Sequence, residues 1–310
     1  MAESREGPTF VAIGGGKGGV GKTLVASSLA IALARRTGEG SPLRVVAVDL
    51  DVGGSNLNLF LGEPLPRHEL TDFLEGRVES LDMIAHPTRA LPNLRLVAGS
   101  MDLVSAGDPV RPRKLALVRA LVGLDADVVV LDLPAGTSPA TLDFFFLGDT
   151  KIVVTNPETA AFHDAYGFLK SYLLRRLITE LRDRQDLLFR VLEWFRDAPP
   201  DEDRTLTGLV ESLQEERPDV APIVVSILSD DTPWLVLNRL RKPRERIYLD
   251  RFRAVVRRHL GLATPELGTI PDEEKIAQSA RTGRPFVLEH PKHRISRVFD
   301  TWADRIARAR

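Results

Sequence analysis

The chain has 310 residues and a formal net charge of -1, so any affinity for nucleic acid or anionic lipid would have to come from a local patch. It contains no cysteine, which excludes disulfides, thiolate metal sites and Fe–S clusters. No stretch approaches the roughly 18 apolar residues of a membrane span, and residues 1–9 lack the apolar region of a secretory signal, so a cytoplasmic protein is expected.

The strongest functional signal is the glycine-rich segment at residues 16–23, which fits the phosphate-binding pattern G-x-x-x-x-G-K-[ST]. The apolar run at residues 10–13 predicts a strand before it, and apolar residues at helical spacing over 24–33 predict a helix after it. Glycines let the loop backbone bring its N–H groups close to phosphate oxygens. Lys22 is then expected at the β- and γ-phosphates and Thr23 on Mg²⁺, unless a glycine-rich turn matches by chance. The predicted phosphate-binding residues are Gly16, Lys17, Gly18, Gly19, Val20, Gly21, Lys22 and Thr23.

Acidic residues follow two further predicted strands. Residues 44–48 form an apolar run, and Asp49 and Asp51 come at its carboxyl end, where ligands of open α/β sheets bind. Residues 128–131 form another run that ends in Asp132, a carboxylate suited to hold Mg²⁺ or its water beside a phosphate loop. The alternatives are an ordinary Asp-Gly turn after the first strand and a structural carboxylate after the second.

The rest of the chain predicts alternating strands and helices, which favours a single domain over residues 1–310. Residues 60–92 predict a surface excursion, 94–97 a strand, 115–124 a short helix and 151–155 a strand. The apolar run at 142–147 predicts core burial, or else packing across a dimer. Apolar residues at helical spacing predict a helical insert at about residues 171–222, which either packs on its own domain or docks a partner.

A basic stretch lies between the last two predicted strands, at residues 234–238 and 267–270. Residues 239–258 hold nine basic and two acidic residues, an excess of seven positive charges. Tyr248, Phe252, Val255 and Val256 are predicted to share one helical face. The basic residues on another face are then either solvated or in contact with the phosphate backbone of DNA. The candidate DNA contacts are Arg246, Arg253 and Arg257.

The glycine loop holds another lysine besides Lys22, and this residue, Lys17, indicates the family of nucleotide-binding proteins. With Lys17, the segment K-G-G-V-G-K-T resembles the deviant Walker A motif of the MinD/ParA family of P-loop ATPases. Residues 49–57, 132–136 and 155–159 are similar to the family motifs D-x-D-x-G-x-x-N-L, D-x-P-A-G and T-N-P-E-x-T, in the same order. The resemblance implies a mostly parallel, doubly wound α/β sheet flanked by helices. It also implies a homodimer formed with ATP, in which Lys17 reaches the partner's nucleotide; from spacing alone Lys17 could equally be a solvated loop lysine.

The resemblance implies roles for individual residues. Catalysis by in-line attack of water would rely on Lys17, Lys22 and Asp51, the last of which positions the water. The Mg²⁺ ion and its shell would involve Thr23, Asp49 and Asp132. An amide can both donate to and accept from a base edge. The residues implied in adenine binding are Asn238, Arg239, Pro271 and Asp272.

Two departures from the family pattern qualify the resemblance. Ser55 stands where MinD-like proteins often carry a basic residue, which puts any contact made by that residue in doubt. The amphipathic membrane-targeting helix that relatives append at the C-terminus is not found, so no stable membrane binding by this chain alone is expected.

The expected function is an ATP-dependent dimerising switch for intracellular positioning, with ATP and Mg²⁺ as its ligands and an unidentified activator protein as a partner. One alternative is an ATP-dependent synthetase of the dethiobiotin-synthetase type, on a related fold. Others are a partitioning ATPase that binds DNA and a binding module without hydrolysis. The presence of Lys17 and Asp51 favours the switch.

Overall fold

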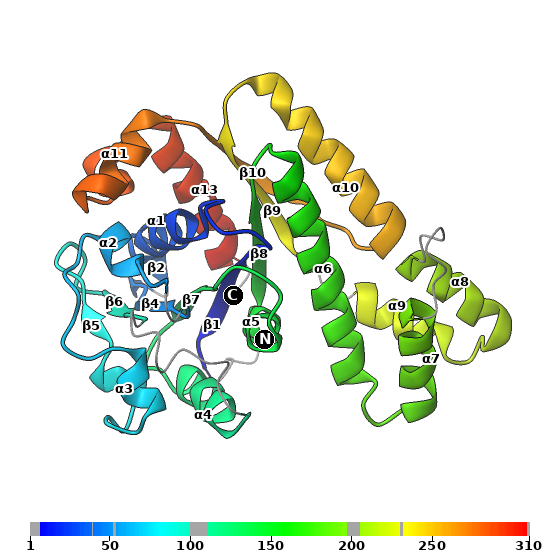
Figure 1. The fold of residues 1–310 in the computed structure, drawn as a ribbon. Coiled ribbons are helices and arrows are strands. Elements are labelled where there is room, and N and C mark those ends of the chain that lie inside the picture. Colours follow the sequence, from blue (N-terminus) through cyan, green and yellow to red (C-terminus); the bar gives the residue numbers. More distant parts are fainter. Residues whose placement is uncertain are drawn as a thin grey trace.

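The computed structural model describes residues 7–38, 40–51, 54–99, 111–196, 205–229 and 232–308. An eight-stranded sheet lies at the centre of the fold (Figure 1). The strand order is β10-β9-β8-β1-β7-β4-β6-β5, and all of these described pairings are parallel except that of β5 with β6. The strands are β1 (Thr9–Gly14), β4 (Val45–Asp49), β5 (His86–Pro87), β6 (Leu94–Val97), β7 (Val128–Asp132), β8 (Thr150–Thr155), β9 (Trp234–Leu240) and β10 (Glu266–Pro271). A separate two-stranded hairpin pairs β2 (Thr37–Gly38) with β3 (Ser41–Pro42).

Helices cover both faces of this sheet and create two cores. Successive side chains of a strand point to opposite faces, so Val11 and Ile13 lie in one core, whereas Phe10 and Ala12 lie in the other. The first face is covered by α1 (Lys22–Ala34), α2 (Leu57–Leu61), α11 (Glu274–Thr282), α12 (Phe286–Glu289) and α13 (Arg294–Arg308). The second face is covered by α3 (Leu70–Leu74), α4 (Arg111–Val122), α5 (Pro139–Leu147) and α6 (Thr159–Glu180). The predicted doubly wound α/β fold is confirmed, and no described helix is both long and apolar enough to cross a bilayer.

The segment after β8 is helical, as predicted, but its boundaries differ from 171–222. The helix α6 passes through residue 171 without a break, because buried side chains recur along its length. It is followed by α7 (Gln185–Arg196), α8 (Leu206–Glu216) and α9 (Ala221–Ser229), the last of which extends past residue 222. Leu187, Val191 and Leu209 belong to the second core, so these helices pack on their own domain. Phe189 and Leu192 of α7 nevertheless remain 56% and 41% exposed.

The helix α10 (Arg246–Leu260) lies along the outside of α6 (Figure 1). The predicted apolar face is correct only in part. Phe252 and Val256 are buried, but Tyr248 and Val255 are each 45% exposed. The reason is that Leu249 and Leu260 complete the inward face, so the helix is rotated relative to the prediction.

The three candidate DNA contacts on α10 have different surroundings. The guanidinium of Arg246 lies 2.7 Å from the carboxylate of Glu266, and Nε of Arg253 donates to the carbonyl of Thr264 at 2.8 Å. Arg257 is exposed. Two of the three arginines thus make contacts within the protein, and a DNA contact at this helix stays a prediction.

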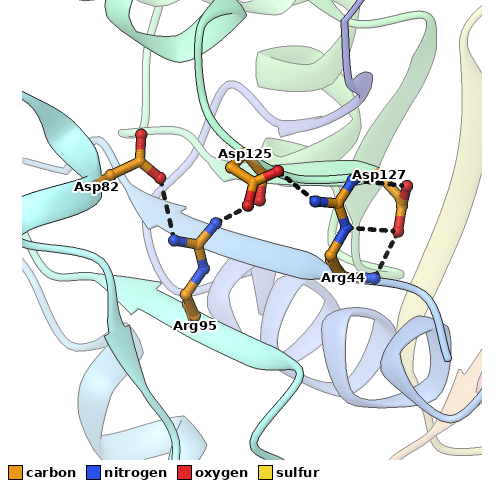
Figure 2. Close-up of polar contacts among 5 residues, drawn as sticks. All are labelled: Arg44, Asp82, Arg95, Asp125 and Asp127. Atoms are coloured by element: carbon orange, nitrogen blue, oxygen red, sulfur yellow. Dashed lines mark hydrogen bonds and ion pairs between the residues drawn. The ribbon is translucent and has the colours of Figure 1, made fainter.

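Ionic contacts join the amino ends of the neighbouring strands β4, β7 and β6 (Figure 2). The backbone N–H of Arg44 donates to the carboxylate of Asp127 at 2.8 Å, and its guanidinium contacts both Asp127 and Asp125. Arg95 lies between the carboxylate of Asp82 at 3.0 Å and the carbonyl of Asp125 at 2.5 Å. These contacts brace the edge of the sheet opposite the carboxyl ends of the parallel strands.

Candidate nucleotide site

Three neighbouring parallel strands bring the predicted phosphate and metal residues together. β7 lies between β1 and β4, and Asp132 is in register with Ile13 on one side and with Asp49 on the other. The glycine loop follows β1 and leads into α1, whose first residue is Lys22. The carboxyl ends of parallel strands meet at one edge, so the aspartates and the loop share one site.

Close packing on one side of the glycine loop explains two of its glycines. A Cβ on Gly16 would overlap the backbone of Asp164 in α6, and one on Gly21 would overlap the amide of Asn238 in β9. Gly21 also has a φ of +102°, which L residues rarely adopt. In contrast, a Cβ on Gly18 would meet nothing within 4 Å. The loop is therefore held from its inner side, and open space remains on its outer side.

A buried lysine and a buried aspartate form the charged centre of the site. Lys22 is 7% exposed, and its Nζ donates to the carbonyl of Lys17 at 3.3 Å. Burial lowers the pKa of Lys22, while attraction from Asp132 opposes this shift. Burial raises the pKa of Asp132 well above its ordinary value, and repulsion from Asp49 adds to the effect. Both groups are thus poised for a ligand that brings compensating charges.

The surroundings of Asp132 fit a Mg²⁺ ligand. Its Oδ1 is buried and has no hydrogen-bond partner among the described residues. A buried carboxylate oxygen is stabilised only by a donor or a cation. The Thr23 side chain opposes the rise in the pKa of Asp132, which indicates that its hydroxyl, a second oxygen ligand suited to Mg²⁺, lies near the same carboxylate. The predicted pair of Thr23 and Asp132 therefore fits a Mg²⁺ ion held directly or through water.

Asp49 has a different environment, because both of its carboxylate oxygens accept hydrogen bonds from the protein. Oδ1 accepts from the backbone N–H of Asp51 at 3.0 Å. Oδ2 accepts from the Ser55 hydroxyl at 2.8 Å and from the N–H groups of Asn56 and Leu57 at 3.1 and 3.0 Å. Asp49 thus anchors the segment that carries Asp51, while its place in the Mg²⁺ shell stays a prediction.

Lys17 lies at the outer side of the loop and forms an ion pair within its own chain. Its Nζ is 3.1 Å from a carboxylate oxygen of Glu158, at the turn into α6, and the two side chains are 36% and 56% exposed. The hydrogen bond from Lys17 is the main reason that the pKa of Glu158 lies below its ordinary value. Lys17 is therefore accessible, unlike the buried Lys22.

The predicted adenine residue Asn238 supports the glycine loop. Its Nδ2 donates to the carbonyl of Val20 at 2.7 Å, and its Oδ1 accepts from the N–H of Arg239 at 2.9 Å. Arg239 has a φ of 58°, the one positive value among the described non-glycine residues. Such strain persists where the surrounding contacts impose it, often at functional sites. Here the Asn238 side chain stabilises both the loop and the turn after β9.

The other two predicted adenine residues lie next to this turn. Pro271 of β10 pairs with Leu240 of β9, and the N–H of Asp272 donates to the carbonyl of Leu240 at 3.0 Å. The strand ends thus bring Asn238 and Asp272 to one edge of the sheet. Contact of either with a base stays a prediction.

Two residues of the site had no role in the sequence interpretation. Glu158 belongs to the turn at residues 155–159 that resembles a family motif, but no pattern in the sequence pairs it with Lys17. Ser55 was noted only as a departure from the family. Glu158 is 141 residues from Lys17 in the chain, and Ser55 lies on the irregular segment between β4 and α2. Only the fold therefore shows the contacts of Glu158 with Lys17 and of Ser55 with Asp49.

A parallel sheet with a glycine loop between its first strand and a helix, a buried loop lysine and an aspartate on the adjacent strand defines a P-loop nucleotide-binding protein. Residues 11–286 match the family described as the CobQ/CobB/MinD/ParA nucleotide binding domain. The chain belongs to this family.

Individual relatives agree with this assignment. The antiactivator FleN of Pseudomonas aeruginosa is 30% identical over 221 residues, 71% of this chain and 73% of that protein. The septum site-determining protein MinD of Bacillus subtilis is 27% identical over 301 residues, 96% of this chain and 88% of that protein. The structure of MinD from Pyrococcus horikoshii complexed with Mg-ADP superposes with a TM-score of 0.64 at 22% identity, covering 96% of each chain. The last likeness shows the fold.

Proposed function

We propose that this chain is an ATP-dependent switch that dimerises with ATP, hydrolyses it to ADP and phosphate, and thereby positions a cellular structure under the control of an activator protein. Support comes from the family and from relatives whose names place them in septum-site determination and antiactivation. The observation that carries the proposal is the contrast between the two lysines of one loop. Lys22 is buried in the glycine loop, whereas Lys17 is accessible on the open side of the loop.

The residues divide the reaction between them. Lys22 and the loop N–H groups would bind the β- and γ-phosphates, and Thr23 and Asp132 would hold Mg²⁺, which neutralises charge on the phosphates. Asp51 would orient the attacking water. The hydrogen bond from its N–H to Asp49 fixes the backbone after β4 and so would hold the Asp51 carboxylate in position.

Dimerisation requires Lys17 to leave Glu158. An exposed ion pair of this kind contributes little to stability, because water solvates both charges. Phosphate oxygens of a nucleotide bound to the partner would offer Lys17 a stronger, charge-assisted contact. The ion pair with Glu158 can therefore hold Lys17 in the monomer and still let Lys17 move to the partner's nucleotide in the dimer.

Size-exclusion chromatography with and without ATP, together with phosphate release, tests the proposal. We expect the wild type to shift to a dimer with ATP, Lys17→Ala to remain a monomer, and Asp51→Ala to form a long-lived dimer with little hydrolysis. Lys292→Ala, which removes an exposed lysine between α12 and α13, is the matched control and should behave as the wild type.

Each result can contradict a different part of the proposal. An ATP-induced dimer of Lys17→Ala would refute the role of Lys17 across the interface. Hydrolysis by Asp51→Ala at the wild-type rate would remove Asp51 from water positioning. A wild type that binds ATP but neither dimerises nor hydrolyses it would leave only a binding module.

A further inference from the structure

Among the described residues, the Asp49 carboxylate receives one side-chain donor, the hydroxyl of Ser55, and three backbone N–H donors. The Ser55 hydroxyl lies 2.8 Å from Oδ2, and Asp49 and Ser55 are 0% and 5% exposed. A hydrogen bond between a hydroxyl and a buried charged oxygen is stronger than one between neutral groups. Loss of this donor would leave a buried carboxylate less well satisfied.

Asp49 also replaces a missing helix cap. Asn56 is the N-cap residue of α2, yet its side chain makes no capping hydrogen bond among the described residues. The N–H groups of Asn56 and Leu57 donate instead to Oδ2 of Asp49, the oxygen that Ser55 contacts. The start of α2 is thus tied to the end of β4 through one oxygen atom.

The other oxygen of Asp49 connects this anchor to Asp51. Oδ1 accepts from the Asp51 N–H at 3.0 Å, and the Asp51 carboxylate lies over Gly54, where an added Cβ would be 3.1 Å from both of its oxygens. Ser55 follows Gly54 directly in the chain. Rotation of the Asp49 carboxylate would therefore disturb both its hydrogen bond with the Asp51 N–H and its contacts with residues 55–57.

Gly99, which follows β6, lies close to the Ser55 side chain. An added Cβ on Gly99 would lie 3.0 Å from the Ser55 hydroxyl oxygen and 3.0 Å from the Asp49 carbonyl oxygen. Such contacts are tighter than ordinary van der Waals separation. Gly99 thus provides a second, independent way to disturb the same hydrogen bond without deleting the hydroxyl.

We propose that Ser55 is a positioning residue for ATP hydrolysis, which acts by holding the Asp49 carboxylate and thereby the backbone that carries Asp51. This proposal rests on the proposed function, in which Asp51 orients the attacking water. The sequence interpretation regarded Ser55 only as the loss of a basic side chain. In the structure, the small hydroxyl side chain makes a buried hydrogen bond with Asp49.

The test compares Ser55→Ala and Gly99→Ala with Ser296→Ala. Ser296 is the matched control, because its hydroxyl is also buried and donates at 2.7 Å, to the carbonyl of His290, but in α13. In steady-state ATP hydrolysis, we expect kcat to fall on the order of tenfold for the two test variants, with KM changed by less than about twofold. The control should keep both constants.

Amide exchange of the ATP-free protein supplies a readout independent of activity. Exchange at Asn56 and Leu57 should be faster in Ser55→Ala and Gly99→Ala, and unchanged in Ser296→Ala. In the double variant of Ser55 and Gly99, kcat should be no lower than in the worse single variant, because both changes act on one hydrogen bond.

The outcomes separate the two proposals. Wild-type kcat and exchange in Ser55→Ala would overturn the role of Ser55, whatever the function of the protein. Faster exchange with an unchanged kcat would also overturn it, because the anchor would then be structural only. If the wild type hydrolyses no ATP, the proposed function fails, and the exchange data still report whether Ser55 holds the segment.

Discussion

Replacing Asn238 with alanine tests whether β9 supports the phosphate loop. The change removes the donor to Val20, at 2.7 Å, and the acceptor for the Arg239 N–H, at 2.9 Å. A hydrogen bond contributes about 1 kcal/mol net, and a buried group left without a partner costs about 1–3 kcal/mol, so the free energy of unfolding should fall by roughly 2–4 kcal/mol. The affinity for ATP should fall about tenfold or more, or at least about 1.4 kcal/mol, because the loop loses its support.

Asn93→Ala is the matched control for this variant. Its Nδ2 donates to the carbonyls of Ala34 and Leu43, at 2.7 and 2.8 Å, away from the glycine loop. Urea unfolding measures the stability of each variant, and calorimetric titration with ATP and Mg²⁺ at a temperature where both are folded measures affinity. If Asn238→Ala bound ATP as tightly as Asn93→Ala at equal loss of stability, Asn238 would serve the fold alone and the reasoning would be refuted.

Two further predictions concern the glycine loop and an ion-paired carboxylate of α5. Gly21→Ala should lower stability by about 2 kcal/mol or more and abolish ATP binding, because φ is +102° and the methyl would overlap a buried amide, whereas Gly18→Ala should keep wild-type stability in urea. For Asp143, burial opposes ionisation, but hydrogen bonds from Arg175 and Lys114 outweigh it and lower its pKa. This carboxylate therefore stabilises the fold above its unfolded pKa of about 3.9, and the contribution is lost as pH falls through the lower folded pKa. Acid titration should show a shallower loss of stability for Asp143→Asn; an unchanged acid limb would contradict the assignment.

Local patterns in the sequence were sufficient to predict most of the sheet and the loop. The strands containing Val11, Val46 and Val129 are apolar runs because both faces of a parallel sheet are covered, and such runs are visible without a structure. Asp132 could be placed in the site for the same reason, since it directly follows a buried strand. The helix at α10 was predicted, but its rotation was not, because Leu249 and Leu260 extended the apolar face beyond the residues chosen.

Contacts between segments far apart in the chain could not be predicted from those patterns. Lys17 and Glu158 are separated by 141 residues, and Asn238 and Val20 by 218. Neither pair has a spacing rule, because their meeting depends on the order in which β1, β8 and β9 lie in the sheet.

The sequence by itself therefore determined that this protein is a P-loop nucleotide-binding protein, since the chemistry of phosphate binding lies in eight consecutive residues at 16–23. Only the tertiary structure decided how the functional groups are held. It showed that Asp49 accepts hydrogen bonds from the backbone N–H of Asp51 and from the Ser55 hydroxyl, and that Asn238 braces the loop. The physical reason is that a buried polar atom takes whichever partner the packed strands bring within about 3 Å, a choice made by the whole fold and not by its neighbours in the chain.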